Sequence, residues 1–184
     1  MSSLAGQLLI ASMDLTNDFF AKAVVLVLEH SDADGATGIA LNKPSDVPLN
    51  EIWPELAKEQ FGRSDELMNI GGPCDGPVIA LHSCNDYAET RLLPGVSMAV
   101  KSNNLLHLVA RTDSNVRMFT GYSGWVPGQL ENEIKEGDWY ATEASSSLVF
   151  CDQAELWRRA CKQFGNKIIA PVAGDQIPID PSLN

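Results

Sequence analysis

The chain has 184 residues, 45% of them hydrophobic, which is enough for one substantial core and too short for two full domains. Its 24 acidic and 13 basic residues give a formal net charge of -11, which repels phosphate backbones and disfavours direct binding to nucleic acid. The first residues lack the basic and apolar segments of a signal peptide, and the longest apolar runs are too short to span a bilayer, so we expect a cytoplasmic protein with no membrane partner.

The beginning of the chain predicts paired strands. Residues 7–12 form an apolar strand, and residues 23–29 are rich in Val and Leu without alternating polar residues, as in a strand buried on both faces. Residues 37–42 form the neighbouring strand. Because Asp34-Gly35 lies between these two runs and both positions tolerate positive φ, we expect a β-hairpin there.

A helix and two short strands follow. Residues 47–62 carry apolar side chains at helical spacing, with Pro54 near the start of the helix and Gly62 as its C-terminal cap. Residues 67–72 and 77–82 are predicted strands on either side of a glycine-rich loop. That loop contains no Lys and does not match a phosphate-binding P-loop.

The second half predicts four strands and three helices. The strands are 96–100, 116–122, 139–142 and 147–150. The helices are 102–111 with Ser102 as N-cap, 128–135 ended by Gly137, and a last helix that starts at Asp152 and ends at Gly165.

Strands with helices inserted irregularly, instead of strict β-α alternation, favour an α+β fold over a doubly wound parallel sheet. We expect a single domain over residues 1–166. The proline-spaced residues 167–184 form an extended or frayed C-terminal tail in this interpretation.

Residues 121–134 form the most specified segment of the sequence. Gly121, Gly124 and Gly128 surround Tyr122 and Trp125, so the backbone is expected to adopt unusual dihedral angles or to pass close to another segment. The two aromatic side chains either stack on a planar ligand or anchor the loop. Backbone N–H groups that follow Gly128 could face an anion at the helix start.

Two polar groups admit either a chemical or a structural role. Glu29 and His30, followed by Asp32 and Asp34, could hold a divalent ion or supply acid and base groups, whereas turn formation explains the aspartates equally. His82 lies beside cysteines that could form a thiolate–imidazole pair, or that are simply buried thiols. Strand alternation places His82 and Cys84 on one face.

The ordered motifs of the chain resemble those of the AlgH/YqgE family of bacterial proteins. They are Gly6-Gln-Leu-Leu-Ile-Ala-Ser12, the segment 19–30 ending in Glu29-His30, Gly38-Ile-Ala-Leu-Asn-Lys-Pro44, Gly71-Gly-Pro73, Leu81-His82 and Gly121-Tyr-Ser-Gly-Trp-Val-Pro-Gly-Gln-Leu-Glu131. The resemblance covers residues 6 to 165 and implies a bifurcated, mainly antiparallel β-sheet curled into a pseudo-barrel with surrounding helices. Cys74 departs from the family pattern, in which an apolar residue often follows Gly-Gly-Pro.

The resemblance carries no established reaction, although some members are labelled transcriptional regulators. Our leading hypothesis is a non-enzymatic binding or regulatory protein with a protein or small-molecule partner and with no metal or cofactor. The alternatives are a hydrolase or metal-dependent enzyme that uses His30, Asp32 and His82, a regulator as labelled in the family, and a structural subunit with an exposed apolar patch. The sequence leaves the oligomeric state open.

The candidate site residues are taken from the glycine loops and the hairpin end. They are Glu29, His30, Asn42, Gly71, Gly72, Pro73, His82, Tyr122, Gly124, Trp125 and Gly128.

Overall fold

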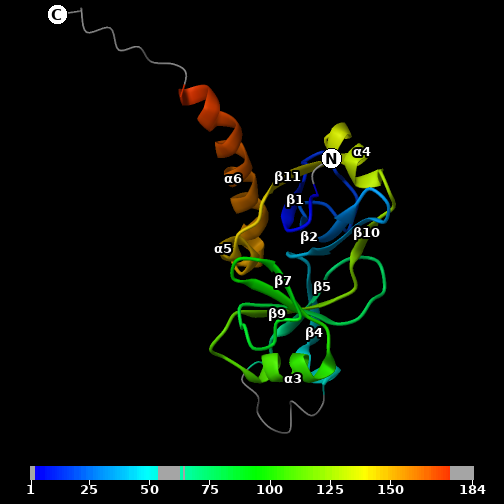
Figure 1. Cartoon of the computed structure of the whole chain (residues 1–184), viewed down its shortest axis with the longest axis vertical. Helices are drawn as coiled ribbons and strands as arrows, with labels where there is room; N and C mark the ends of the chain where they lie inside the picture. The colour runs from blue at the N-terminus through cyan, green and yellow to red at the C-terminus, as the bar shows by residue number, and fades with distance from the viewer. Residues whose placement is uncertain (1–2, 54–62, 64, 175–184) are drawn as a thin grey trace, which may run out of the picture.

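The computed structural model describes residues 3–53, 63 and 65–174, except the side chains of 167–174. Two β-sheets lie one after the other along the long axis of the molecule, with helices at their faces and ends (Figure 1). The α+β class is confirmed. Within the described part of the chain neither sheet closes into a barrel.

The first sheet has five strands, all paired antiparallel, in the order β10-β3-β2-β1-β11. The strands are β1 (Gln7–Ala11), β2 (Val24–Ser31), β3 (Gly35–Ala40), β10 (Ser123–Trp125) and β11 (Trp139–Glu143). The predicted hairpin is confirmed, because β2 and β3 pair up to Ser31 and Gly35 and Gly35 has a φ of 83°. The Val24–Val27 stretch of β2 is buried on both faces, as its apolar run predicts.

The second sheet has six strands in the order β4-β5-β9-β6-β8-β7, and only the β5–β9 pair is parallel. The strands are β4 (Pro44–Pro48), β5 (Leu67–Ile70), β6 (Ile79–His82), β7 (Thr90–Leu93), β8 (Val96–Ala99) and β9 (Val116–Thr120). Strands β4 and β7 have no counterpart in the sequence prediction. Both lie at the edges of the sheet, where short, polar strands are common.

The helices are α1 (Leu49–Ile52), α3 (Ser102–Ala110), α4 (Gln129–Glu136), α5 (Ser146–Val149) and α6 (Gln153–Gly174). Figure 1 shows α3 beyond the second sheet at one end of the molecule, and α4 beside the first sheet. Across the residues that the structure describes, no helix has the length and apolar character needed to cross a membrane.

The core is divided into three clusters that follow this architecture. One cluster joins both sheets to α6 and includes Leu26, Leu81 and Phe119. A second lies between the six-stranded sheet and α3, and a third surrounds Trp125 and Trp139 on the five-stranded sheet.

Arg117 crosses the boundary between the sheets. Its guanidinium donates to the backbone oxygens of Leu41 and Val149, the latter at 2.9 Å, and lies 5.4 Å from the ring centroid of Phe119. No carboxylate pairs with it within the described residues, and burial lowers its pKa to about 10. A charged group of this kind is tolerated because its N–H groups satisfy carbonyls that would otherwise be buried without donors.

Two sequence predictions are wrong. Residues 147–150 were expected to form a strand, but Ser146–Val149 is the short helix α5, because the Ser145 side chain caps it by accepting from the Leu148 N–H. The last helix was expected to end at Gly165, but α6 continues to Gly174. A helix-interior glycine costs only about 1 kcal/mol, which its helix-forming neighbours can offset.

Other boundaries need smaller corrections. Lys101, not Ser102, is the N-cap of α3, and its side chain makes no capping hydrogen bond. Instead, the Glu89 carboxylate accepts a hydrogen bond from the Lys101 N–H at 2.9 Å. The predicted helix 47–62 is wrong at its start, because Val47 and Pro48 belong to β4; α1 covers Leu49–Ile52 and ends at Trp53, and the part from 54 to 62 lies outside the described residues. The predicted tail beyond residue 174 also lies outside them, and the division at residue 166 stays a prediction.

Substitution of Gly165 tests whether α6 continues through this residue. A Cβ added there meets nothing within 4 Å, so Gly165→Ala should raise the free energy of unfolding by about 0.5–1 kcal/mol, because alanine loses less backbone entropy in a helix. Urea unfolding followed by circular dichroism measures this change.

Gly72→Ala is the matched opposite case, because its Cβ would lie 2.0 Å from the Tyr122 carbonyl carbon and should destabilise the fold. A loss of stability in Gly165→Ala would contradict the continuous helix and favour a left-handed glycine that ends it.

Candidate functional site

The two glycine-rich segments of the sequence cross each other in the structure. Cys74 and Tyr122 exchange two backbone hydrogen bonds, both of 3.0 Å. A Cβ on Gly71 would lie 2.4 Å from the Gly121 carbonyl oxygen, and Gly121 itself has a φ of 70°. The glycines are therefore required by close backbone approach, as the sequence indicates.

Beyond this crossing, β10 ends in Trp125, and α4 begins after Gly128, whose φ is 78°. Glu133 lies on the inner side of α4. Its Oε2 accepts hydrogen bonds from the indole N–H groups of both Trp125 (2.7 Å) and Trp139 (2.9 Å), and its Oε1 accepts from the Gln129 amide (2.8 Å). One carboxylate thus ties β10, β11 and α4 together.

Four aromatic rings meet beside this carboxylate. Phe20 contacts Phe19 edge-on at 5.0 Å between ring centroids and Trp139 edge-on at 5.5 Å. Trp125 and Trp139 are also edge-to-face, at 6.1 Å. These geometries are the favourable ones for aromatic pairs and hold the rings in fixed orientations.

A cavity of about 260 Å³ opens among these groups, and we call it the aromatic pocket. It is lined by Leu15, Asn17, Phe20, Pro73, Gly124, Trp125, Gln129, Glu133, Asp138 and Trp139. The lining includes two carboxylates and no basic side chain. Aromatic rings and carboxylates together provide the two groups that attract an organic cation.

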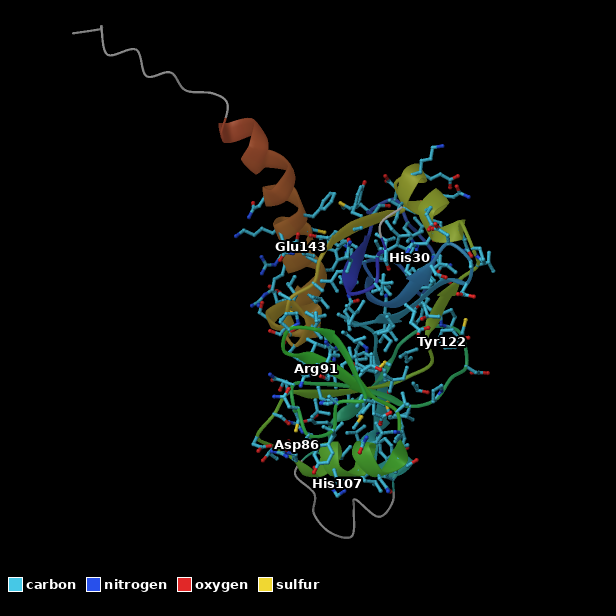
Figure 2. All side chains as sticks on the ribbon, in the orientation of Figure 1. His30, Asp86, Arg91, His107, Tyr122 and Glu143 are labelled. Atoms are coloured by element: carbon cyan, nitrogen blue, oxygen red, sulfur yellow. The ribbon has the colours of Figure 1, made fainter. Side chains whose placement is uncertain are left out.

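The end of the β2–β3 hairpin forms a second cavity, also of about 260 Å³, lined by residues 29–31 and 34–37. Figure 2 shows His30 in the part of the molecule that holds the five-stranded sheet, away from Arg91 and His107. The His30 Nδ1 accepts from the Leu4 N–H at 3.2 Å, and its Nε2 lies 2.7 Å from Glu131 Oε1. Because Nδ1 is an acceptor, Nε2 carries the proton and donates to Glu131, so the ring links the N-terminal segment to α4.

His82 and Asn42 lie away from both cavities. His82 is fully buried in β6, neither ring nitrogen has a hydrogen-bond partner, and burial lowers its pKa. Cys84 is buried in the cluster under α3, and no hydrogen bond joins these two described side chains. Asn42 accepts from the Val24 N–H and donates to the Lys22 oxygen, each at 2.8 Å, and so connects the end of β3 to the start of β2.

The sequence candidates are therefore distributed over distinct places. Pro73, Gly124 and Trp125 line the aromatic pocket, while Glu29 and His30 line the hairpin-end cavity. His30 and His82 belong to different sheets. Among the residues described, no group of three or more His, Cys, Asp or Glu side chains could hold a metal ion.

Seven lining residues of the aromatic pocket were not among the sequence candidates, namely Leu15, Asn17, Phe20, Gln129, Glu133, Asp138 and Trp139. The sequence did contain a signal for Glu133 and Trp139. Trp125 and Trp139 flank the helix that carries Glu133, so a short connection brings both indoles near one carboxylate. Phe20 reaches the site only through the pairing of β1, β2 and β11, which the sequence does not reveal.

Comparison with known proteins gives a consistent family relationship. A family model described as AlgH-like matches residues 8–169. A UPF0301 protein of Streptomyces avermitilis is 36% identical, with 100% of this chain and 97% of the relative covered. A UPF0301 protein of Chlorobaculum parvum is 34% identical over 95% of this chain and 94% of its own length.

Two solved structures share the fold. The solution structure of the AlgH protein from Pseudomonas aeruginosa matches with a TM-score of 0.73 and 25% identity, covering 96% of this chain and 95% of that protein. A crystal structure of a protein from Corynebacterium diphtheriae matches with a TM-score of 0.71 and 24% identity, over 89% of this chain and 87% of that one. The second likeness concerns the fold alone.

The contact between Glu131 and His30 predicts that part of the protein's stability depends on pH. A backbone hydrogen bond at Glu131 itself and the bond from His30 lower the pKa of the Glu131 carboxyl below its ordinary value of 4.5. Stability from this group is therefore fully present above the ordinary value and is lost as the pH falls through the folded pKa. Glu131→Gln should differ most from the wild type above about pH 5 and converge with it on acidification.

Urea unfolding at a series of pH values measures this difference in the free energy of unfolding. Glu136→Gln is the control, because it removes the same charge from the exposed end of α4. A Glu131→Gln difference that stays constant with pH would contradict the role given to the carboxylate.

Proposed function

The chain belongs to the AlgH-like family, and we propose that it is a non-enzymatic binding protein whose aromatic pocket holds a cationic group. The group is an ammonium or guanidinium carried by a small molecule or by a side chain of a protein partner. The observation that carries this proposal is the Glu133 carboxylate, held by two indole N–H groups in a pocket walled by aromatic rings.

Charge supports a cationic ligand. Glu133 and Asp138 both line the pocket, no Lys or Arg is among its lining residues, and the whole chain has a formal charge of -11. The field of the protein therefore concentrates cations near the pocket and repels anions. Cations also gain about 0.5–2 kcal/mol over an aromatic face, depending on desolvation.

The pocket is preorganised for this role. Glu133 Oε2 is occupied by two indole donors, whereas Oε1 accepts a hydrogen bond from Gln129 alone within the described residues. A carboxylate oxygen has two lone pairs, so Oε1 retains acceptor capacity toward a ligand N–H. Because the carboxylate is already ordered, binding does not require its side chain to lose further rotamer entropy.

The enzymatic alternative is less well supported by the same geometry. His30 Nδ1 accepts the Leu4 N–H and its Nε2 contacts Glu131, so both ring nitrogens are engaged in structural contacts. His82 lies in the other sheet and is fully buried. For a regulatory role, the charge favours action through a protein or small ligand over direct contact with DNA.

A ligand titration tests the proposal. Tetramethylammonium, choline and the blocked side-chain analogues of lysine and arginine should shift the Trp125 and Trp139 indole N–H resonances, with at least one dissociation constant near about 1 mM or tighter. Glu133→Gln keeps the side-chain shape and removes the charge, and should weaken binding by about 1 kcal/mol, or about fivefold. Phe20→Leu should also weaken it, because the π face is lost while apolar volume remains.

Glu136→Gln provides the charge-matched control, because Glu136 is exposed on the same helix and does not line the pocket. Its binding should equal that of the wild type. Absence of indole shifts for every cation, or equal weakening in Glu133→Gln and Glu136→Gln, would overturn the assignment.

A further inference from the structure

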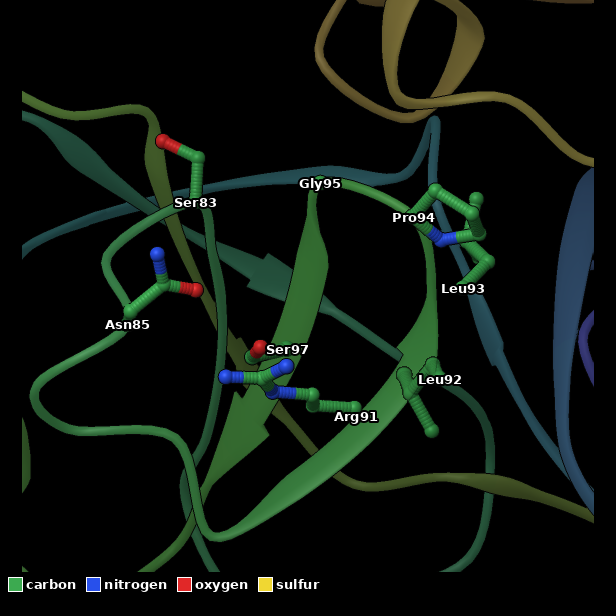
Figure 3. Close-up of a pocket in the computed structure, with 8 residues that line it drawn as sticks. All are labelled: Ser83, Asn85, Arg91, Leu92, Leu93, Pro94, Gly95 and Ser97. Carbon is green, nitrogen blue, oxygen red and sulfur yellow. The ribbon is translucent and has the colours of Figure 1, made fainter.

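A cavity of about 300 Å³ lies at the edge of the six-stranded sheet, and we call it the Arg91 pocket. Figure 3 shows its lining residues, which come from the β7–β8 hairpin and from the segment after β6. They are Ser83, Asn85, Arg91, Leu92, Leu93, Pro94, Gly95 and Ser97. The hairpin closes through Pro94-Gly95, where Gly95 has a φ of 77°.

Arg91 is the only charged residue in this lining. Its guanidinium has no ion pair or hydrogen bond with another described residue, whereas Arg63, Arg111 and Arg158 each contact a carboxylate. The acidic groups nearby in sequence are engaged elsewhere. Glu89 accepts from the Lys101 N–H and the Asn104 amide, and Asp86 pairs with Arg111.

The remaining polar lining supplies further donors. Ser83 Oγ accepts from the Asn115 N–H at 3.0 Å, which leaves its own hydroxyl hydrogen free to donate. Asn85 is exposed and contributes an amide, and Ser97, the register partner of Arg91, contributes a hydroxyl to the lining (Figure 3). A guanidinium, an amide and two hydroxyls around one cavity form a donor set suited to an oxyanion.

The strand register extends this polar set into the interior. Ser97 pairs with Arg91 on one side and with His82 on the other, so the three side chains share one face of the sheet. His82 is fully buried, and both of its ring nitrogens lack partners. His82 does not itself line the pocket, so the polar set that faces the cavity is Ser83, Asn85, Arg91 and Ser97.

We propose that the Arg91 pocket binds a small organic anion, a carboxylate or phosphate monoester with a short apolar part. Arg91 holds the oxyanion through paired N–H donors, and Asn85 and Ser97 complete its hydrogen bonds. Leu92, Leu93 and Pro94 form the apolar wall that favours an organic anion over an inorganic one. This site is independent of the cation site in the aromatic pocket, which belongs to the other sheet.

The test is a titration of the full chain with butyrate, phenyl phosphate and inorganic phosphate at constant ionic strength, followed by the Asn85 amide and Arg91 Nε–H resonances. At least one organic anion should shift both signals and bind more tightly than inorganic phosphate. A butyrate preference identifies a carboxylate ligand, and a phenyl phosphate preference a phosphate monoester. Arg91→Gln should weaken that binding by about tenfold or more.

Arg159→Gln is the matched control, because it removes the same charge from an exposed position on α6 outside this pocket. It should bind like the wild type. Since Arg91 is exposed on an edge strand, its replacement should leave the fold intact, which the unchanged urea midpoint would show.

Three outcomes would overturn the proposal. One is the absence of shifts with both organic anions, and another is equal weakening in the two arginine variants. The third is inorganic phosphate binding as tightly as the organic anions, which would remove the role of the apolar wall.

Discussion

The hydrogen bonds from two indoles to one carboxylate organise the most distinctive part of this protein. Glu133 joins Trp125 at the end of β10 to Trp139 at the start of β11, across the helix α4 that connects them. Without this carboxylate, two buried indole N–H groups would lose their acceptors, at a cost of about 1–3 kcal/mol each. The same contacts orient the aromatic rings and the charge that form the proposed cation site.

The two sheets carry pockets of opposite character. The aromatic pocket belongs to the five-stranded sheet and is lined by carboxylates, whereas the Arg91 pocket lies at the edge of the six-stranded sheet and is lined by one guanidinium. Arg117 and the central core hold the sheets together between these places. The net charge of -11 favours the proposed cation site, whereas the proposed anion site depends on the local charge of the unpaired Arg91.

Short-range sequence patterns predicted much of the fold. The aromatic pocket depends on contacts between distant segments of the chain, which such patterns do not reveal. Asp34-Gly35 and its flanking apolar runs identified the β2–β3 hairpin, because turn geometry and strand pattern are short-range properties. The apolar run 147–150 is too short for its pattern to distinguish a strand from a helix. The side-chain cap from Ser145 stabilises the helix α5 there. Phe20 and Pro73 reach the aromatic pocket from distant parts of the chain, so composition and spacing could not place them beside Trp125.

The central claim is that an organic cation lies against the aromatic rings beside Glu133. Intermolecular nuclear Overhauser effects between the methyl protons of tetramethylammonium and the side chains of the protein test it most directly. We predict cross-peaks to the ring protons of Phe20, Trp125 and Trp139, which surround the pocket. Cross-peaks confined to residues outside the pocket, such as Trp157 on α6, would contradict the account.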